Sequence, residues 1–158
     1  MSSPRPVTAG RPRPTNLAVL MRDAFVALND VVIARLTERG HPEVRSAHGA
    51  VFQHLDDTGT TVSVLAERAQ MTKQAMAELV RHLEKHGYLT RIADPNDRRA
   101  KLVTPTDRGR EVITIAQELV PELEERVSSV VGDDRVVALR KDLEAIRTAV
   151  TRPPPTRL

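Results

Sequence analysis

Residues 65–109 have the sequence LAERAQMTKQAMAELVRHLEKHGYLTRIADPNDRRAKLVTPTDRG, and this stretch holds the clearest structural pattern in the chain. Apolar residues recur at spacings of three and four over 72–86, which predicts an amphipathic helix. Beyond that helix the apolar spacing changes to two, which predicts strands at 88–92 and 101–104. The eight residues 93–100 would join them, and a loop this long is typical of functional segments.

A second, shorter helix is predicted just before this one, beginning at Thr61 or Ser63 and ending at Ala69. Gln70 and Met71 then form a tight turn, and Thr72 is suited to cap the longer helix. Two short helices joined by such a turn have the dimensions of a helix-turn-helix, whose second helix enters the major groove of DNA. An ordinary helical hairpin would give the same pattern.

The exposed face of the longer helix, near its N-terminus, offers side chains that read bases or bind phosphate. Gln can pair with adenine, Lys and Arg with guanine or phosphate, and a small Ala allows close approach to a thymine methyl group. The candidate DNA-reading residues on this helix are Thr72, Lys73, Gln74, Ala77, Glu78 and Arg81.

The hairpin loop adds a second candidate contact with DNA. An arginine inserted into a narrow minor groove meets a strongly negative potential, and Asp97 is placed to hold the Arg99 guanidinium in an extended pose. The alternative is a solvated charged turn. The candidate residues of this loop are Asp97, Arg98, Arg99 and Lys101.

These residues carry a family resemblance. The run from 65 to 109, with DPNDRR at 94–99 followed by LVTPTDRG, resembles the MarR family of winged-helix regulators. The resemblance implies a homodimer with intertwined terminal helices, two wings, and repression relieved by a small ligand. It also implies that Arg99 is the minor-groove arginine, Asp97 its support and 72–81 the base-reading segment. Val103 departs from the family's leucine, which leaves the fold secure.

The resulting fold class is mainly α with a small β-hairpin wing, a winged helix-turn-helix that dimerises through its N- and C-terminal helices. Helices are expected at 16–39, 46–55, 111–130 and 134–150 around the central unit, with a kink at Pro121. Pro105 would end the second strand, and Thr106 is suited to cap the helix that follows, with Asp107 in its first turn. The expected domains are a disordered basic arm (1–15), an N-terminal dimerisation helix (16–45), the DNA-binding domain (46–108), C-terminal dimerisation helices (109–150) and a disordered tail (151–158).

Composition and charge limit the alternatives. The 158 residues include no cysteine, which excludes disulfides, thiolate zinc sites and thiol redox sensing, and aromatic residues are only 2%, which makes base stacking and an aromatic core improbable. Residues 72–110 hold nine Lys and Arg against five acids, whereas 111–150 hold nine acids against five bases. The middle of the chain is therefore basic. No apolar run is long enough to span a membrane, and we expect a cytoplasmic protein that does not bind membranes.

The remaining side chains indicate a candidate ligand pocket and include one row with the spacing of metal ligands. Phe25, His41, Arg45, His48 and Phe52 lie near a helix junction and are the candidate effector pocket, suited to a phenolic or other aromatic or anionic molecule. Glu78, His82 and His86 have metal-ligand spacing, but three ligands on a DNA-reading helix would conflict with DNA, so no metal and no other cofactor is expected.

Catalytic motifs are not found, so an enzyme such as a small hydrolase is the remotest reading. The function expected is sequence-specific binding of double-stranded DNA by a dimeric regulator, with a repressor relieved by a ligand as the leading form. The alternative is a constitutive architectural or protein-interaction module without a ligand response.

Overall fold

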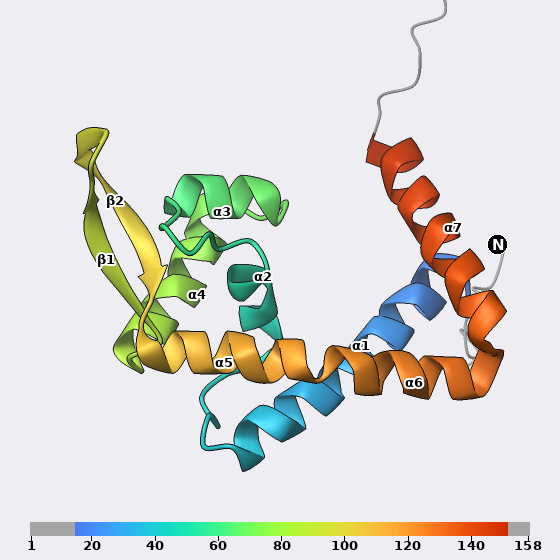
Figure 1. Ribbon diagram of the computed structural model, residues 1–158. Coiled ribbons are helices and arrows are strands. Elements are labelled where there is room, and N and C mark those ends of the chain that lie inside the picture. The colour runs from blue at the N-terminus through green and yellow to red at the C-terminus, as the bar shows by residue number, and fades with distance from the viewer. Residues whose placement is uncertain (1–14, 152–158) are drawn as a thin grey trace, which may run out of the picture.

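The computed structural model describes residues 15–151 as a series of helices interrupted by one two-stranded hairpin (Figure 1). The expected basic arm and C-terminal tail fall almost wholly on 1–14 and 152–158, outside the described residues. In chain order the elements are α1 (Leu17–Glu38), the 3₁₀-helix η1 (Ser46–His48), α2 (Gly49–Phe52), α3 (Val62–Arg68), α4 (Lys73–Lys85), β1 (Leu89–Asp94), β2 (Asp97–Pro105), α5 (Asp107–Glu118), α6 (Val120–Val131) and α7 (Asp133–Thr151).

Side-chain oxygens cap the N-termini of the main helices. Thr72 accepts a hydrogen bond from the Ala75 N–H at the start of α4, and Thr106 accepts one from the Gly109 N–H at the start of α5. Each bond satisfies one of the amides that a helix leaves without an internal partner. Both caps were predicted from the sequence and are confirmed. The positive φ of 53° at Gln70 forms the tight turn between α3 and α4.

The core lies where α3, α4, α5 and the base of the hairpin meet, and it is aliphatic, as the composition predicts. Leu65, Met76, Val80 and Leu83 are fully buried, and Tyr88 is the one large ring fully buried among the described residues. The periodicity of three and four therefore places one face of α4 against the core and leaves the other exposed.

Two glycines join α4 and α5 to the hairpin. Gly87 ends α4 at φ +76°, where the Tyr88 N–H reaches back to the Leu83 carbonyl. At Gly109, in the first turn of α5, an added Cβ would clash with the backbone carbonyl of Tyr88. The absence of a side chain there lets α5 pack directly against the start of the hairpin.

The hairpin differs from the prediction of two short strands and an eight-residue loop, which was wrong. β1 and β2 pair antiparallel from Leu89 and Pro105 outward to Asp94 and Asp97, so only Pro95 and Asn96 remain in the turn. The register shifts between Ala93 and Asp94, which leaves residues 98–100 as an irregularity in β2. The charged residues of this region gave no alternating pattern, yet Asp94 pairs with Asp97 and Ala93 with Lys101, which extends both strands.

Smaller differences concern helix ends. The helix expected at 46–55 begins as η1 and ends with α2 at Phe52, because the His54 N–H turns back to the Val51 carbonyl. The helix expected over 111–130 begins at Asp107, directly after its Thr106 cap, and is interrupted at Leu119, with Pro121 in the first turn of α6. The structure thus has a one-residue break at Leu119, two residues before the proline at which a kink was predicted. Figure 1 shows α5 and α6 nearly end to end, with the hairpin at one end of this rod and α7 rising from the other.

Candidate nucleic-acid interface

The N-terminal face of α4 is exposed as expected. Thr72, Lys73, Gln74, Glu78 and Arg81 are all exposed, and Ala77 is half-buried against the core. The opposite face is held by the buried side chains of Met76 and Val80. The six predicted residues therefore lie on a part of α4 that is turned away from the core, and five of them are open to a partner.

The hairpin presents a second exposed group. Asp97, Arg98, Arg99 and Lys101 are exposed along β2. The Asp97 carboxylate accepts a hydrogen bond from the backbone N–H of Arg99 at 2.9 Å, and not from the guanidinium as the sequence argument supposed. Asp94 binds the Asn96 N–H in the same way at 2.8 Å. The two carboxylates thus shape the backbone of the hairpin tip and leave the arginine side chains unengaged.

The exposed cations of α4 and the hairpin differ from most of the other arginines in their ion pairing. Arg22, Arg35, Arg39, Arg68, Arg91, Arg108, Arg110, Arg126 and Arg140 each pair with a carboxylate. Within residues 15–151, by contrast, no ion pair involves Lys73, Arg81, Arg98, Arg99 or Lys101. The cations on α4 and the hairpin therefore keep their positive charge uncompensated by a nearby carboxylate, which favours an anionic partner.

α4 and the hairpin are tied to each other by a two-point ion pair. Arg91 on β1 donates from Nε to Glu84 Oε1 at 2.7 Å and from its terminal nitrogen to Glu84 Oε2 at 3.3 Å. A bidentate pair of this kind fixes geometry as well as distance. It holds the base of the hairpin against the C-terminal half of α4.

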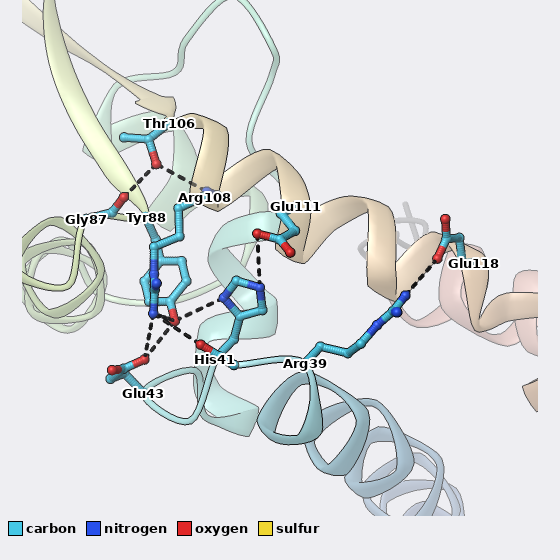
Figure 2. A network of polar contacts seen from close by, with 11 residues as sticks. Arg39, His41, Glu43, Gly87, Tyr88, Thr106, Arg108, Glu111 and Glu118 are labelled. Carbon is cyan, nitrogen blue, oxygen red and sulfur yellow. Dashed lines mark hydrogen bonds and ion pairs between the residues drawn. The ribbon is translucent and has the colours of Figure 1, made fainter.

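Behind α4 and the hairpin lies a polar network that sequence reasoning missed (Figure 2). The buried Tyr88 hydroxyl donates to the Glu43 carboxylate at 2.8 Å and accepts from Arg108 at 2.9 Å, and Arg108 also donates to Glu43 at 3.2 Å. The hydrogen bond from Tyr88, aided by Arg108, lowers the pKa of Glu43. Burial, with the adjacent Glu43, raises the pKa of Tyr88. No local periodicity marks these three residues, because they come from three separate segments.

Two of the predicted pocket histidines belong to this buried region instead. His41 is 2% exposed, with Nδ1 3.3 Å from the Tyr88 hydroxyl and Nε2 3.4 Å from a Glu111 oxygen. The His48 ring stacks on His82 of α4 with 4.7 Å between ring centroids, and its Nδ1 accepts the Arg45 N–H at 2.9 Å. Burial first, and then the charges that His82, Arg45 and His86 can carry, lower the pKa of His48 to about 4.

A cavity of about 840 Å³ lies between α1, the η1–α2 segment and the α5–α6 rod. Phe25, Arg45 and Phe52 line this cavity, whereas His41 and His48 do not. Most of its walls are aliphatic, with Leu28, Val32, Ile33, Val112 and Val120 among the lining residues. The predicted set of five therefore divides into three residues at one cavity and two in the buried polar region, since both histidines have partners behind it.

Residues 15–151 contain neither a metal-binding cluster nor a helix able to span a membrane. Glu78, His82 and His86 do not gather into a ligand set, and residues 15–151 hold no cluster of three or more His, Asp or Glu side chains suited to a metal ion. His82 is already engaged, since its Nε2 donates to the Glu43 carbonyl oxygen at 3.0 Å. Within the described part of the chain, no helix is both long and apolar enough to cross a membrane.

Comparison with known proteins gives the same DNA-binding region. The model of the MarR family matches residues 44–100. The chain is 29% identical over 85 residues to the transcriptional activatory protein BadR of Rhodopseudomonas palustris, a match that covers 54% of this chain and 47% of BadR. It is 34% identical over 65 residues to the uncharacterized HTH-type transcriptional regulator YdcH of Bacillus subtilis, covering 41% and 44%. The chain thus spans less than half the length of these two relatives.

Solved structures share nearly the whole fold. The S. aureus MepR–DNA complex superposes with a TM-score of 0.68 at 17% identity, covering 86% of this chain and 99% of MepR. The transcriptional repressor CouR, bound to a 23-mer DNA duplex, gives 0.67 at 24% identity, covering 84% and 92%. The transcriptional regulator SlyA gives 0.71 at 17% identity, covering 86% and 94%.

The helix-turn-helix of α3 and α4, followed at once by a hairpin, defines the class of protein as a winged helix-turn-helix protein. The match of residues 44–100 to the MarR family model and the shared fold make this part of the chain similar to the DNA-binding region of MarR-family transcriptional regulators. In this fold α4 occupies the position of the recognition helix, and the β1–β2 hairpin occupies the position of the wing.

Proposed function

We propose that the chain regulates transcription by binding a palindromic operator as a homodimer, with α4 in the major groove and the wing in the minor groove. The observation that carries this proposal is that most other arginines form ion pairs, whereas the exposed cations of α4 and the wing named below do not. Lys73 and Arg81 on α4, and Arg98, Arg99 and Lys101 on the wing, are exposed and have no carboxylate partner within residues 15–151. DNA phosphates would supply the missing negative charge.

The roles of helix and wing differ. Gln74, exposed in the first turn of α4, is suited to pair with adenine, and Glu78 to accept from the amino group of cytosine. Arg99, whose backbone is fixed by Asp97 and whose side chain is unengaged, is suited to a narrow minor groove. α4 would thus recognise the base sequence, and the wing would add affinity that depends on the width of the minor groove.

Dimerisation is supported by apolar surface on the terminal helices. The exposed apolar side chains on α1 include Leu17, Leu20, Phe25 and Val26, and those on α7 include Val137, Leu139, Leu143 and Ile146. Monomeric proteins rarely leave continuous apolar patches above a few hundred Å² exposed. A second copy of the chain would cover these faces and would present two recognition helices to a two-fold operator.

The cavity supports a ligand response. Its walls are mainly aliphatic, and Arg45 contributes a positive charge for which the described residues hold no ion pair. Asp56 and Asp57 also line the cavity, and the Asp56 carboxylate is paired with Arg68. The aliphatic wall and Arg45 suit a phenolic or other aromatic anion, which would bury its ring and pair its charge with Arg45. We propose that the protein represses from its operator, in the cytoplasm, and that such a ligand relieves repression. CouR is described as a repressor and BadR as an activatory protein, so a reporter assay must fix the direction.

The proposal is tested by selecting duplexes from a randomised library at moderate salt. Two inverted half-sites about one helical turn apart are expected to be enriched, and to bind about a thousand-fold or more tightly than scrambled DNA. A constitutive architectural module would instead give no enriched sequence and equal affinity for both. That result would overturn the proposal.

The ligand response is tested with benzoate and hydroxybenzoates as probe anions on the selected duplex. At least one probe is expected to weaken operator binding by the wild type, and Arg45→Ala is expected to reduce that response while keeping operator affinity without the probe. Full response in Arg45→Ala would remove Arg45 from the site. A wild type insensitive to the whole panel would exclude simple aromatic carboxylates as effectors.

A further inference from the structure

Glu43 touches both DNA-reading elements from behind. Its carbonyl oxygen accepts a hydrogen bond from His82 Nε2 on α4 at 3.0 Å. Its carboxylate accepts from the Tyr88 hydroxyl at 2.8 Å, and Tyr88 is the residue immediately before β1 of the wing. One residue of the segment between α1 and η1 is therefore bonded to the recognition helix through its backbone and to the base of the wing through its side chain.

The next two residues after Glu43 form part of the cavity wall. Val44 and Arg45 both line the cavity of about 840 Å³, and Val44 is also buried in the core at 3% exposure. The Arg45 N–H donates to His48, whose ring stacks on the same His82. The short stretch from Glu43 to His48 thus has one side on the cavity and two attachments to His82 of α4.

This stretch is not held in a regular helix or strand before Ser46. Residues 39–45 are turns and irregular backbone, with hydrogen bonds such as His41 N–H to the Leu36 carbonyl and Val44 N–H to the His41 carbonyl. Irregular segments of this kind shift without breaking a hydrogen-bonded ladder, which is why loops and element ends absorb conformational changes.

We propose that Glu43 and His82 are positioning residues that couple the cavity to the recognition helix and the wing. An occupant of the cavity that displaces Val44 and Arg45 moves Glu43 with them, and Glu43 moves His82 and Tyr88. The proposal rests on the function proposed above. Because coupling between two sites is reciprocal, DNA binding must in turn change the cavity. That consequence is measurable without knowing the natural ligand.

The experiment places a reporter in the cavity. The chain has no cysteine, so Gln53→Cys gives a single labelling site on the cavity wall, to be modified with the solvent-sensitive dye acrylodan. Emission is recorded on the full chain with and without the selected duplex, at concentrations that saturate binding. The labelled protein is expected to show a change in emission when the duplex is added.

Substitutions then show which side chains couple DNA binding to the cavity. His82→Leu keeps an apolar body of similar size but cannot donate to Glu43, and is expected to lose the emission change while DNA remains bound. His82→Gln keeps an N–H donor and is expected to retain the change. His86→Leu is the matched control, one turn along α4 and in ring contact with His82, and is also expected to retain it. Tyr88→Phe, which preserves the ring, tests the wing side and is expected to give a smaller change.

The outcomes separate the two proposals. No duplex bound by the labelled parent would count against the proposed function itself. DNA bound with no emission change in the parent, or with the full change in both His82→Leu and Tyr88→Phe, would overturn the coupling through Glu43 and leave DNA binding standing. If His82→Leu proves unfolded by circular dichroism, the test rests on the other two variants. A smaller emission change in Tyr88→Phe than in His86→Leu then supports the coupling, and equal changes overturn it.

Discussion

His48 is an ionisable residue that the structure buries in its neutral form. It is 3% exposed, and its neighbours are His82, His86 and the Arg45 backbone and guanidinium. Burial is the main reason why the pKa of His48 falls to about 4, and the charges that His82, Arg45 and His86 can carry lower it further. The neutral ring accepts the Arg45 N–H through Nδ1, so the segment on the cavity wall depends on His48 remaining uncharged.

The first prediction follows from that pKa. Between about pH 6.5 and about pH 4 the unfolded chain binds a proton at His48 that the folded chain does not, so stability falls as the pH falls through this range. The loss is on the order of 3 kcal/mol at most for this one group. His48→Asn keeps an acceptor for Arg45 without titrating. Urea unfolding at pH 7 and pH 4 is expected to show a smaller loss in this variant than in the wild type, whereas equal losses would contradict the role of His48.

At the scale of residues, the sequence predicted those side chains whose bonding partners lie close by in the chain. Thr72 and Thr106 were predicted as caps because a cap bonds an amide three residues on. His41 and His48 do not line the cavity with the other three predicted residues, and Glu43, Tyr88 and Arg108 were missed, since their partners lie far away in sequence. Phe25, Arg45 and Phe52 line one cavity, and their role in binding a ligand stays a prediction.

At the scale of elements, the close approach of α5 to the start of the wing depends on Gly109. A Cβ there would meet the Tyr88 carbonyl and the Pro105 side chain. Gly109→Ala is therefore expected to destabilise the fold by about 1–3 kcal/mol through overpacking. Gly49→Ala is the control, because Gly49 lies in α2 with open space around its Cβ position, and it is expected to be neutral or slightly stabilising. Chemical denaturation of both variants measures the difference, and equal stabilities would contradict the packing described.

Elements were predictable where apolar periodicity was strong, as in α4, and not where backbone pairing decides. The wing is the instructive case. Arg98 and Arg99 gave no strand pattern, because both project into solvent, yet β2 begins at Asp97 through pairing with β1. The early end of α2 at Phe52 likewise depends on a turn, from His54 back to Val51, that no side-chain pattern announces.

At the scale of the whole molecule, the apolar faces of α1 and α7 make the dimer the expected functional unit. Leu139 and Leu143 are each 41% exposed in the single chain. Replacing both with Glu is therefore expected to leave the monomer folded, to abolish the dimer at micromolar concentration, and to lower operator affinity strongly. Lys141→Glu on the same helix is the control. Sedimentation velocity decides, and a wild type that sediments as a folded monomer would contradict the prediction.

The charge distribution of the chain fits one arrangement on DNA. The basic region, residues 72–110, contains α4 and the wing, while the acidic region from 111 onward contains most of α5 and all of α6 and α7. A dimer built on the terminal helices would hold its acidic part away from the duplex and bring two basic regions to it. Electrostatic attraction then orients the protein before any base is read.

The most direct test of this account is a salt titration of binding for the wild type, Gln74→Ala and Arg99→Ala, on the selected operator and on scrambled DNA. Gln74→Ala is expected to cost about 1–3 kcal/mol on the operator and relax one base preference per half-site. Arg99→Ala is expected to weaken binding to both DNAs with base preference kept, and to make the log–log salt slope shallower by about one unit for each charge removed. Unchanged affinity and slope in Arg99→Ala on both DNAs would show that the hairpin is a charged turn and not a wing that binds DNA.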